Sequence, residues 1–415
     1  MSTCVLLLWL SGCWSGEPEG TPKAEYTTER PNDELSEEQQ DLIAELEAIG
    51  YLSTADVDLE GRRGVTIHDE ELAWPGLNFF TSGHGPGAIL MDMTGRVLHE
   101  WHREFSDVWP DYPIEEDHKA TYHWRRARLL RNGDVVALFG GLGIFRLDSN
   151  SQLLWALPNR AHHDIFVTES GDIWVLTREA HLVERIDAEK PILEDFVVVL
   201  DGQGKEKRRF SVLEAFEKHS DFPQMWAERK MEPDIFHTNS IKLLDGSLSP
   251  QLTAFKAGNI LTSSRHLNVV AILDPQTEAL VWWLKGDFEH QHDPRITPQK
   301  TLLLFNNNGK STFSTVMELD PISREPVWEL HGERDVPLRS PACGAAQRLA
   351  NGNTLITESN GARAIEVTSD KKVVWEYLNP RRSAKHEAIR PKKEKPGRLF
   401  DMQRLPLDYA DVWWK

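Results

Sequence analysis

The chain is poor in cysteine, with three among 415 residues: Cys4, Cys13 and Cys343. Two of them precede residue 14, so the rest of the chain has a single thiol and cannot hold an internal disulfide. The C-x-x-C spacings of zinc modules are also absent. These absences exclude a disulfide scaffold and a cysteine-ligated zinc domain, and a hydrophobic content of 40% supports a core instead.

Long apolar runs and positive charge are also scarce. No run of 18 or more apolar residues exists, so we expect no membrane-spanning helix. There are 47 basic against 65 acidic residues, a formal charge of −18. Because nucleic-acid binding depends on basic surfaces, we expect no nucleic-acid partner. The basic stretch from Arg381 to Arg398 is interpreted as a solvated loop.

The first 13 residues resemble a bacterial lipoprotein signal. A short apolar run ends in Leu10-Ser-Gly-Cys13, where small residues admit the signal peptidase and the thiol takes the lipid. We expect residues 1–13 to be this signal, and the protein to be exported as a periplasmic or cell-surface lipoprotein held to the membrane by Cys13. No Lys or Arg precedes the run, so other secretion and a cytosolic location stay open.

Residues 14–60 are predicted to form a tether that carries one helix. Glu, Pro, Thr and Gly dominate its first part, which favours an unstructured chain. Ser36 and Gln39 then form a capping-box pattern, and Gly50 follows the last turn. The helix is therefore expected at 37–49, with one apolar face docked on the domain.

From residue 74 onward the sequence repeats. Six segments share an apolar strand, a polar turn and an apolar pair that ends in an aromatic, and a second hairpin precedes most of them. The closing aromatics are Trp101, Trp155, Phe210, Trp282, Trp328 and Trp375, spaced 54, 55, 72, 46 and 47 residues apart. Two hairpins per repeat at such periods indicate a four-stranded propeller blade.

The first blade lacks its first strand, and the missing strand occurs at the other end of the chain. Residues 400–408 copy the first-strand pattern, so the C-terminal strand should close the ring and remove exposed sheet edges. We therefore predict an all-β fold in which residues 61–415 form one six-bladed β-propeller. Two insertions are expected: 205–233, partly helical, and 247–258, a loop.

Histidines recur at one place in the repeat. Residues just before the first strand of a blade should lie at one mouth of the central channel, and four blades have histidine there. These histidines are His123, His162, His163, His237, His290 and His292. Cys343 takes this place in the fifth blade, for which we expect a structural role, and Arg265 ends a channel-side strand. Its planar fork suits a sulfate, phosphate or carboxylate.

Two chemistries use clustered histidines: metal ligation by neutral imidazoles, and nucleophilic or acid–base catalysis. A cation beside a metal site repels the metal, whereas beside a histidine nucleophile it holds an anionic substrate. Arg265 therefore favours the second chemistry.

Four motifs of this chain resemble those of the bacterial arylsulfate sulfotransferase family. They are His162-His-Asp-Ile, Phe236-His-Thr-Asn-Ser, Ser263-Ser-Arg-His and Gln291-His-Asp-Pro. The resemblance covers roughly residues 75–405. It implies an exported six-bladed propeller that moves a sulfuryl group from one phenol to another through a sulfohistidine, independent of a nucleotide donor.

The resemblance also implies roles for individual residues. His292 resembles the nucleophile, and His237 and Arg265 resemble the groups that bind the sulfuryl oxygens. His163, or its neighbour His162, resembles the remaining histidine of the site. The implied partners are a small aryl sulfate and a phenol, with no cofactor and no metal.

Two other functions stay open. The first is a ligand- or protein-binding propeller without catalysis. The second is a metal-dependent hydrolase or lyase, which needs three imidazoles about 2.0–2.1 Å from one point. Asp164 or Asp293 would then supply a nearby carboxylate.

Overall fold

The computed structural model describes residues 35–47, 61–115, 118–228, 232–309, 311–383 and 395–414. The predicted signal with Cys13 and most of the predicted tether lie outside these residues. The chain divides into two units, Met1–Leu35 and Ser36–Lys415, and the second is the one described below. Within the described residues, none of the helices has the length and hydrophobicity to cross a membrane.

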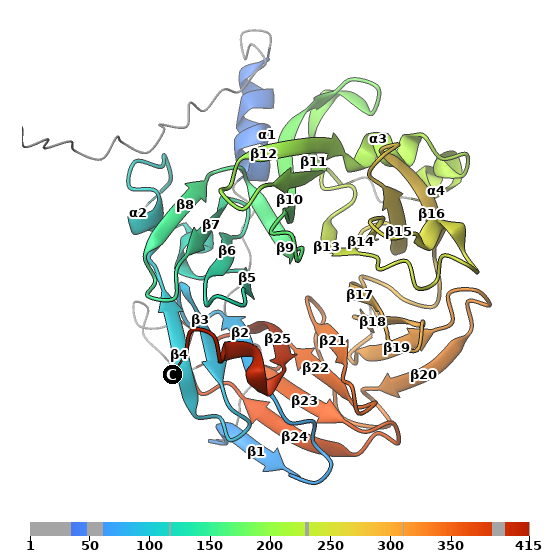
Figure 1. Cartoon of the computed structure of the whole chain (residues 1–415). Coiled ribbons are helices and arrows are strands. Elements are labelled where there is room, and N and C mark those ends of the chain that lie inside the picture. The colour runs from blue at the N-terminus through green and yellow to red at the C-terminus, as the bar shows by residue number, and fades with distance from the viewer. Residues whose placement is uncertain are drawn as a thin grey trace, which may run out of the picture. The chain divides into compact units, whose positions relative to one another are not determined.

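Six antiparallel sheets stand around a central channel, which confirms the predicted six-bladed β-propeller (Figure 1). From the centre outward, the first three blades are β25 (Leu399–Leu405), β2 (Leu77–Ser82), β3 (Gly87–Met91) and β4 (Val97–His102); β5 (Arg126–Leu129), β6 (Val135–Phe139), β7 (Gly143–Leu147) and β8 (Leu153–Leu157); and β9 (Ala161–Val167), β10 (Ile173–Val183), β11 (Asp187–Leu200) and β12 (Glu206–Ser211).

The other three blades follow the same order from the centre outward. They are β13 (Thr238–Leu243), β14 (Ile260–Ser264), β15 (Val269–Asp274) and β16 (Ala279–Leu284); β17 (His292–Ile296), β18 (Leu302–Asn306), β19 (Thr315–Leu319) and β20 (Pro326–His331); and β21 (Ala345–Arg348), β22 (Thr354–Glu358), β23 (Arg363–Val367), β24 (Val373–Leu378) and β1 (Gly64–His68). The innermost strands β5, β9, β13, β17, β21 and β25 line the channel.

The repeated tryptophan has a structural reason. In four blades, the indole Nε1–H at the end of the repeat donates a hydrogen bond to a carbonyl in a turn of the next blade. The pairs are Trp101 with Gly133 (3.1 Å), Trp155 with Gly202 (3.0 Å), Trp328 with Ser369 (2.9 Å) and Trp375 with Met93 (2.8 Å). The closing aromatic therefore attaches each of these blades to its neighbour while its ring fills the space between two sheets.

The ring is closed as predicted. Strand β25 pairs antiparallel with β2, so that Leu405 lies opposite Leu77. Arg404 of β25 is fully buried, with its Nη1 2.9 Å from a Glu366 carboxylate oxygen and its Nε donating to Asn78 at 2.8 Å. Strand β1 was not predicted: it pairs with β24 and adds a fifth strand to the last blade.

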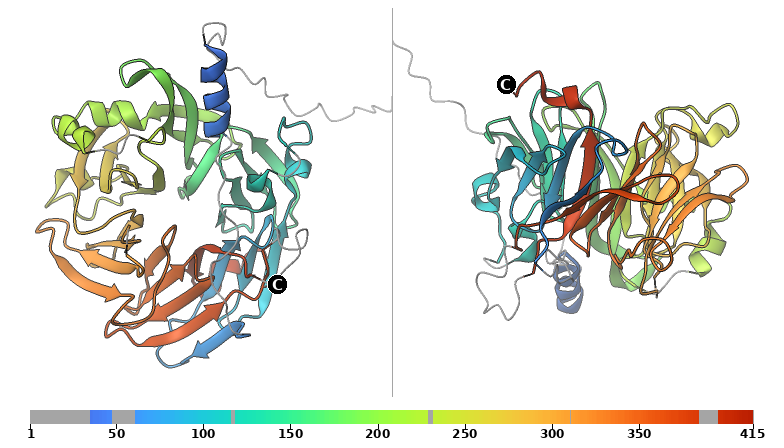
Figure 2. Two further views of the ribbon diagram at one scale, coloured as in Figure 1. Left: turned by 180° about the vertical axis from the view of Figure 1, so that it is seen from behind. Right: turned by 90° about the horizontal axis from the view of Figure 1, so that it is seen from below.

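The helix before the ring is α1 (Glu37–Glu47). The Ser36 N–H donates to the Gln39 side chain at 3.0 Å, and the Gln39 N–H donates to the Ser36 hydroxyl at 3.2 Å, which is the predicted capping box. Its Leu46 packs with Ala180 and Leu193 of the third blade. Figure 2 shows α1 and the C-terminus on opposite faces of the ring.

The remaining helices are short and lie in connections. They are α2 (Phe105–Val108), η2 (Lys119–Tyr122), α3 (Val212–Glu217), α4 (Phe222–Ala227), η3 (Thr253–Phe255) and η5 (Leu407–Ala410). Helices α3 and α4 occupy the insertion at 205–233 that was predicted to be partly helical. The insertion at 247–258 is a loop with the single turn η3.

Candidate active site

The predicted histidines lie where three innermost strands begin. Strand β9 begins with Ala161, His162 and His163, His237 directly precedes β13, and His292 is the first residue of β17. The strand registers are not identical, however. His162 and His292 each pair with the fourth residue of the second strand, whereas Thr238 pairs with the fifth residue of β14, and His237 lies just before the first paired residue of β13.

Unusual backbone conformations gather at this mouth. Five non-glycine residues here have φ between 46° and 65°: His163, His237, His290, Asp293 and Cys343. This left-handed region costs non-glycine residues free energy and is concentrated at functional sites. The start of β9, of β13 and of β17 also departs from regular pairing by a bulge, which turns the side chains there out of the usual alternation.

His292 is buried, and its hydrogen bonds define its tautomer. Its Nδ1 lies 2.7 Å from Asn307 Oδ1 and 2.9 Å from the His290 carbonyl oxygen. The Asn307 side chain is oriented by its Nδ2, which donates to the carbonyls of Ser340 and Cys343. Two acceptors at Nδ1 require a proton there, so Nε2 carries the lone pair. Burial, and next the charge of Arg265, hold the pKa of His292 well below its usual value, so the ring is neutral.

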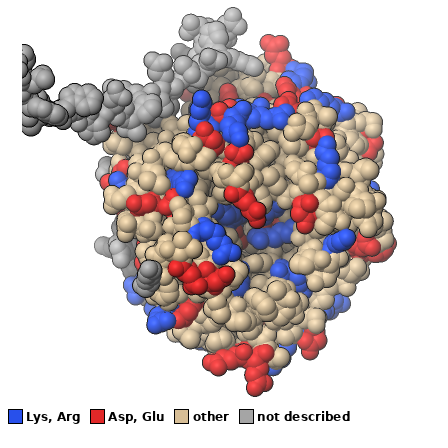
Figure 3. Space-filling view, in the orientation of Figure 1, with Lys and Arg blue, Asp and Glu red and all other residues tan. Residues whose placement is uncertain are grey.

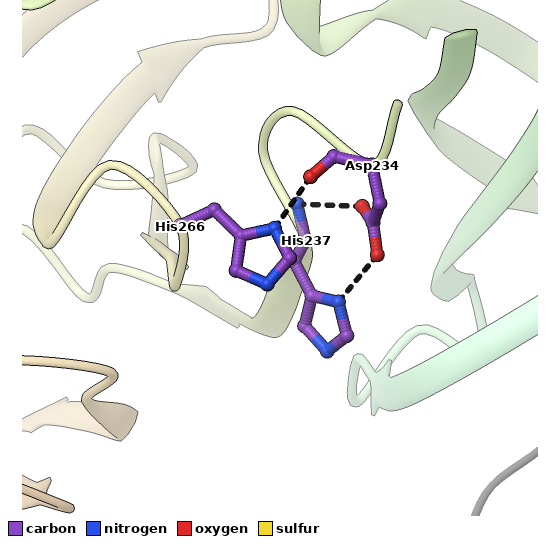
Figure 4. A group of neighbouring side chains, drawn as sticks. All are labelled: Asp234, His237 and His266. Carbon is purple, nitrogen blue, oxygen red and sulfur yellow. Dashed lines mark hydrogen bonds and ion pairs between the residues drawn. The ribbon is translucent and has the colours of Figure 1, made fainter. Parts of the chain in front are cut away.

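His237 is held by Asp234, a residue that the sequence interpretation missed. Its Nδ1 lies 2.5 Å from Asp234 Oδ2, and its backbone N–H donates to Oδ1 at 3.1 Å (Figure 4). The Asp234 carbonyl accepts from His266 Nδ1, whose ring centroid is 4.7 Å from that of His237. Burial tends to raise the pKa of Asp234, but His237 and His266 outweigh it and lower that pKa. The Asp234 carboxylate therefore keeps the proton on Nδ1 of His237.

The neighbouring histidines of β9, His162 and His163, have different surroundings. Their Nδ1 atoms lie 2.7 Å apart. His162 directs its Nε2 to Asp195 Oδ1 at 3.3 Å, whereas the His163 ring lies against His237 with the centroids 4.7 Å apart. Burial, and then the charge of His237, hold the pKa of His163 well below its usual value. Of the two, His163 is therefore the one in contact with the other site histidines.

Arg265 follows the end of β14. Its Nη2 lies 3.4 Å from His290 Nδ1, and its backbone N–H donates to the His237 carbonyl. Within the described ranges, no carboxylate lies within ion-pair distance of Arg265. Burial lowers the pKa of its guanidinium. An anion that binds beside a half-buried guanidinium in this setting stabilises its positive charge.

Cys343 lies at the same mouth, but it directly precedes β21 of the last blade, so its predicted place in the fifth blade is wrong. Its Sγ accepts from Arg125 Nη2 at 3.2 Å, and its carbonyl orients Asn307. Burial raises the pKa of the thiol, but Arg125 and Arg398 outweigh it, so the pKa lies below its usual value. Arg125 and Asn307 were missed because no residue pattern marks them; each becomes visible only through the group that it contacts.

A group of side chains that could hold a metal ion exists among the described residues, but it contains neither of the carboxylates that the sequence suggested. Potential ligand atoms of Asp234, His237 and His266 lie within 4.8 Å of one another. The Nδ1 atoms of both rings already bond to Asp234. The carboxylates suggested for a metal enzyme, Asp164 and Asp293, form ion pairs with Lys242 instead.

Comparison with solved structures finds other propellers at low similarity. A protein of unknown function from Bacteroides caccae is 13% identical, with 74% of this chain and 94% of that chain covered and a TM-score of 0.48. A streptogramin B lyase is 13% identical over 78% and 85% of the two chains, with a TM-score of 0.42. Virginiamycin B lyase from Staphylococcus aureus is 14% identical over 80% and 89%, with a TM-score of 0.42. Such values carry no functional argument.

A comparison with curated proteins gives no match. The family model described as "Arylsulfotransferase (ASST)" matches residues 126–380, which is more than half of the chain. This range contains Arg265 and His162, His163, His237, His290 and His292 but not His123, and it covers four complete blades and part of another. The chain belongs to the arylsulfotransferase family.

Proposed function

We propose that the protein transfers a sulfuryl group from an aryl sulfate to a phenol through a sulfohistidine at His292. The observation that carries this proposal is the state of His292. Its ring is neutral, its Nδ1–H is occupied by Asn307, and its Nε2 lone pair is available next to Arg265. A neutral imidazole beside a cation is what attack on an anionic sulfuryl donor requires.

In the first half-reaction, His292 Nε2 attacks sulfur, the bond from sulfur to the aryl oxygen breaks, and a phenolate leaves. The ring becomes positive because Nδ1 keeps its proton, and the acceptors at Nδ1, Asn307 Oδ1 and the His290 carbonyl, stabilise this charge. Arg265 and His237 bind the sulfuryl oxygens, and His163 completes the site. In the second half-reaction an acceptor phenol attacks sulfur, the S–N bond breaks, and the phenolic proton passes to solvent, which gives ping-pong kinetics.

The experiment incubates the purified protein with a chromogenic aryl sulfate, with and without an acceptor phenol, after treatment with a chelator. We expect release of the chromogenic phenol that depends on the acceptor and survives the chelator. Absence of release contradicts the proposal and favours a binding propeller. Release that is lost with the chelator contradicts it in favour of a metal enzyme, for which Asp234, His237 and His266 are the candidate ligands.

We also propose that the protein is exported and held to a membrane by a lipid on Cys13, on the pattern of its first 13 residues. A Cys13→Ser variant should then leave the membrane fraction, because it lacks the thiol that takes the lipid. Fractionation of cells that express either form measures this. Identical distributions of the two forms contradict the anchor.

A further inference from the structure

The channel has a second mouth, at the end where the innermost strands finish. A cavity of about 500 Å³ lies there. It is lined by the ends of β5 and β9, by single residues of β13, β17 and β25, and by Tyr409 of η5. Figure 3 shows this face, with a central hollow in which Lys and Arg side chains gather. Because all six innermost strands begin at the histidine mouth, the cavity lies at the opposite end of the channel.

A charged layer separates the two ends. Its cations are Arg126, Arg128, Lys242 and Arg295, and its carboxylates are Asp164, Asp293 and Asp401. They form one connected network: Arg128 lies 2.6 Å from Asp164 and 2.8 Å from Asp401, and Arg295 lies 2.8 Å from Asp293. Each carboxylate is shared by two or three cations. Five innermost strands therefore meet in a single buried salt-bridge network.

The network has one more cation than it has carboxylates, four against three. Burial tends to raise the pKa of Asp164, but Lys242, Arg128 and Arg126 outweigh it and lower that pKa, so the carboxylate is ionised. Counted at their ordinary charges, the four cations and three carboxylates carry a formal excess of one positive charge. Arg128, Arg131, Lys242 and Arg295 line the cavity, and Glu169 is the one acidic residue among the described residues that line it.

Part of the cavity wall is apolar. Leu129, Phe166, Val167 and the ring of Tyr409 contribute to the lining. Ligand cavities of roughly 300–1,000 Å³ that combine apolar walls with a few convergent polar groups bind small organic molecules. A buried excess charge is costly unless a counter-ion pairs with it.

We propose that this cavity binds a small organic anion that has one negative charge on a flat apolar body, such as an aromatic carboxylate or sulfonate. The anionic group pairs with Lys242 and Arg295, and the apolar body lies against Phe166 and Tyr409. The histidines at the other mouth take no part in this binding. The site is thus independent of the proposed sulfuryl transfer.

The test measures binding of 2-naphthoate to the full-length protein by calorimetry, with the neutral 2-naphthamide as the matched ligand. The matched variants are Val167→Glu and Val167→Gln, which lose the same packing and differ in charge. We expect 2-naphthoate to bind the unaltered protein and to raise its melting temperature. The amide should bind at least about tenfold more weakly. Val167→Glu supplies an internal anion and should weaken naphthoate binding at least about tenfold relative to Val167→Gln.

His292→Ala serves as the second control, because binding at the histidine mouth would respond to it whereas binding at the cavity should not. The proposal is overturned if the unaltered protein gives neither heat nor a melting shift with naphthoate. It is also overturned if the two Val167 variants bind equally, or if His292→Ala removes the binding. Each of these results is independent of whether the protein transfers sulfuryl groups.

Discussion

We expect His292→Ala to abolish sulfuryl transfer, with kcat lowered by at least about 10³-fold. Alanine has no lone pair at the position of Nε2, so no covalent intermediate can form, and Asn307 Oδ1 loses its donor. The measurement is acceptor-dependent release of phenol, followed by mass analysis of protein quenched during turnover. The unaltered protein should carry one extra SO₃ on the peptide that contains His292, and the variant should carry none.

The matched control is His331→Ala, since His331 lies in β20 at the edge of a blade, where its ring bonds to Glu329. This variant should transfer at the unaltered rate. Circular dichroism and the melting temperature of both variants establish that the ring is intact. Retained acceptor-dependent turnover in His292→Ala would remove His292 from the mechanism, whatever the state of the other histidines.

Arg265→Lys should lower kcat/KM by about 10²–10³-fold, the magnitude typical for loss of a charge-stabilising donor. Lysine keeps the positive charge but not the planar fork, so two sulfuryl oxygens can no longer be held at once. The half-buried guanidinium has no carboxylate within ion-pair distance among the residues that the structure describes, which leaves it available to the substrate. Steady-state kinetics with an aryl sulfate donor measures the loss.

Arg96→Lys is the corresponding control, because Arg96 is exposed in a turn and pairs with Asp92 in the same turn. Its kinetics should match those of the unaltered protein. If Arg265→Lys shows near-normal kcat/KM, Arg265 holds the backbone between His237 and His290 and does not bind the sulfuryl group. A lower melting temperature with unchanged kcat/KM would also show that Arg265 has a structural role and does not bind the sulfuryl group.

The number of blades and the closure of the ring were predictable because consecutive blades must contact each other, and this requirement recurs along the chain. An indole at the end of a repeat can donate to the next blade only if the two blades follow one another at a suitable distance, so Trp101, Trp155 and Trp375 mark the period. Strand β1 escaped prediction for the opposite reason. Its partner β24 lies more than 300 residues away, and five residues without a hairpin of their own give no local signal.

For the site, the sequence predicted which histidines share a mouth but not what each one contacts. His237 and His292 were placed at equivalent positions, whereas His292 pairs with β18 and His237 lies just before the first paired residue of β13. Asp234 lies three residues before His237, and this spacing is a signal that could have been noticed. Asn307 had no such signal, because it meets His292 only through the pairing of β17 with β18. The catalytic roles stay predictions.

The exchange of strands between the two ends of the ring has a consequence for how the chain acquires its structure. The first blade receives its innermost strand from residues 399–405, and the last blade receives its outermost strand from residues 64–68. A growing chain therefore holds β2 with an open inner edge until residues 399–405 are available. Folding of the first blade must wait for these residues, and a product that lacks them would keep that edge exposed to other chains.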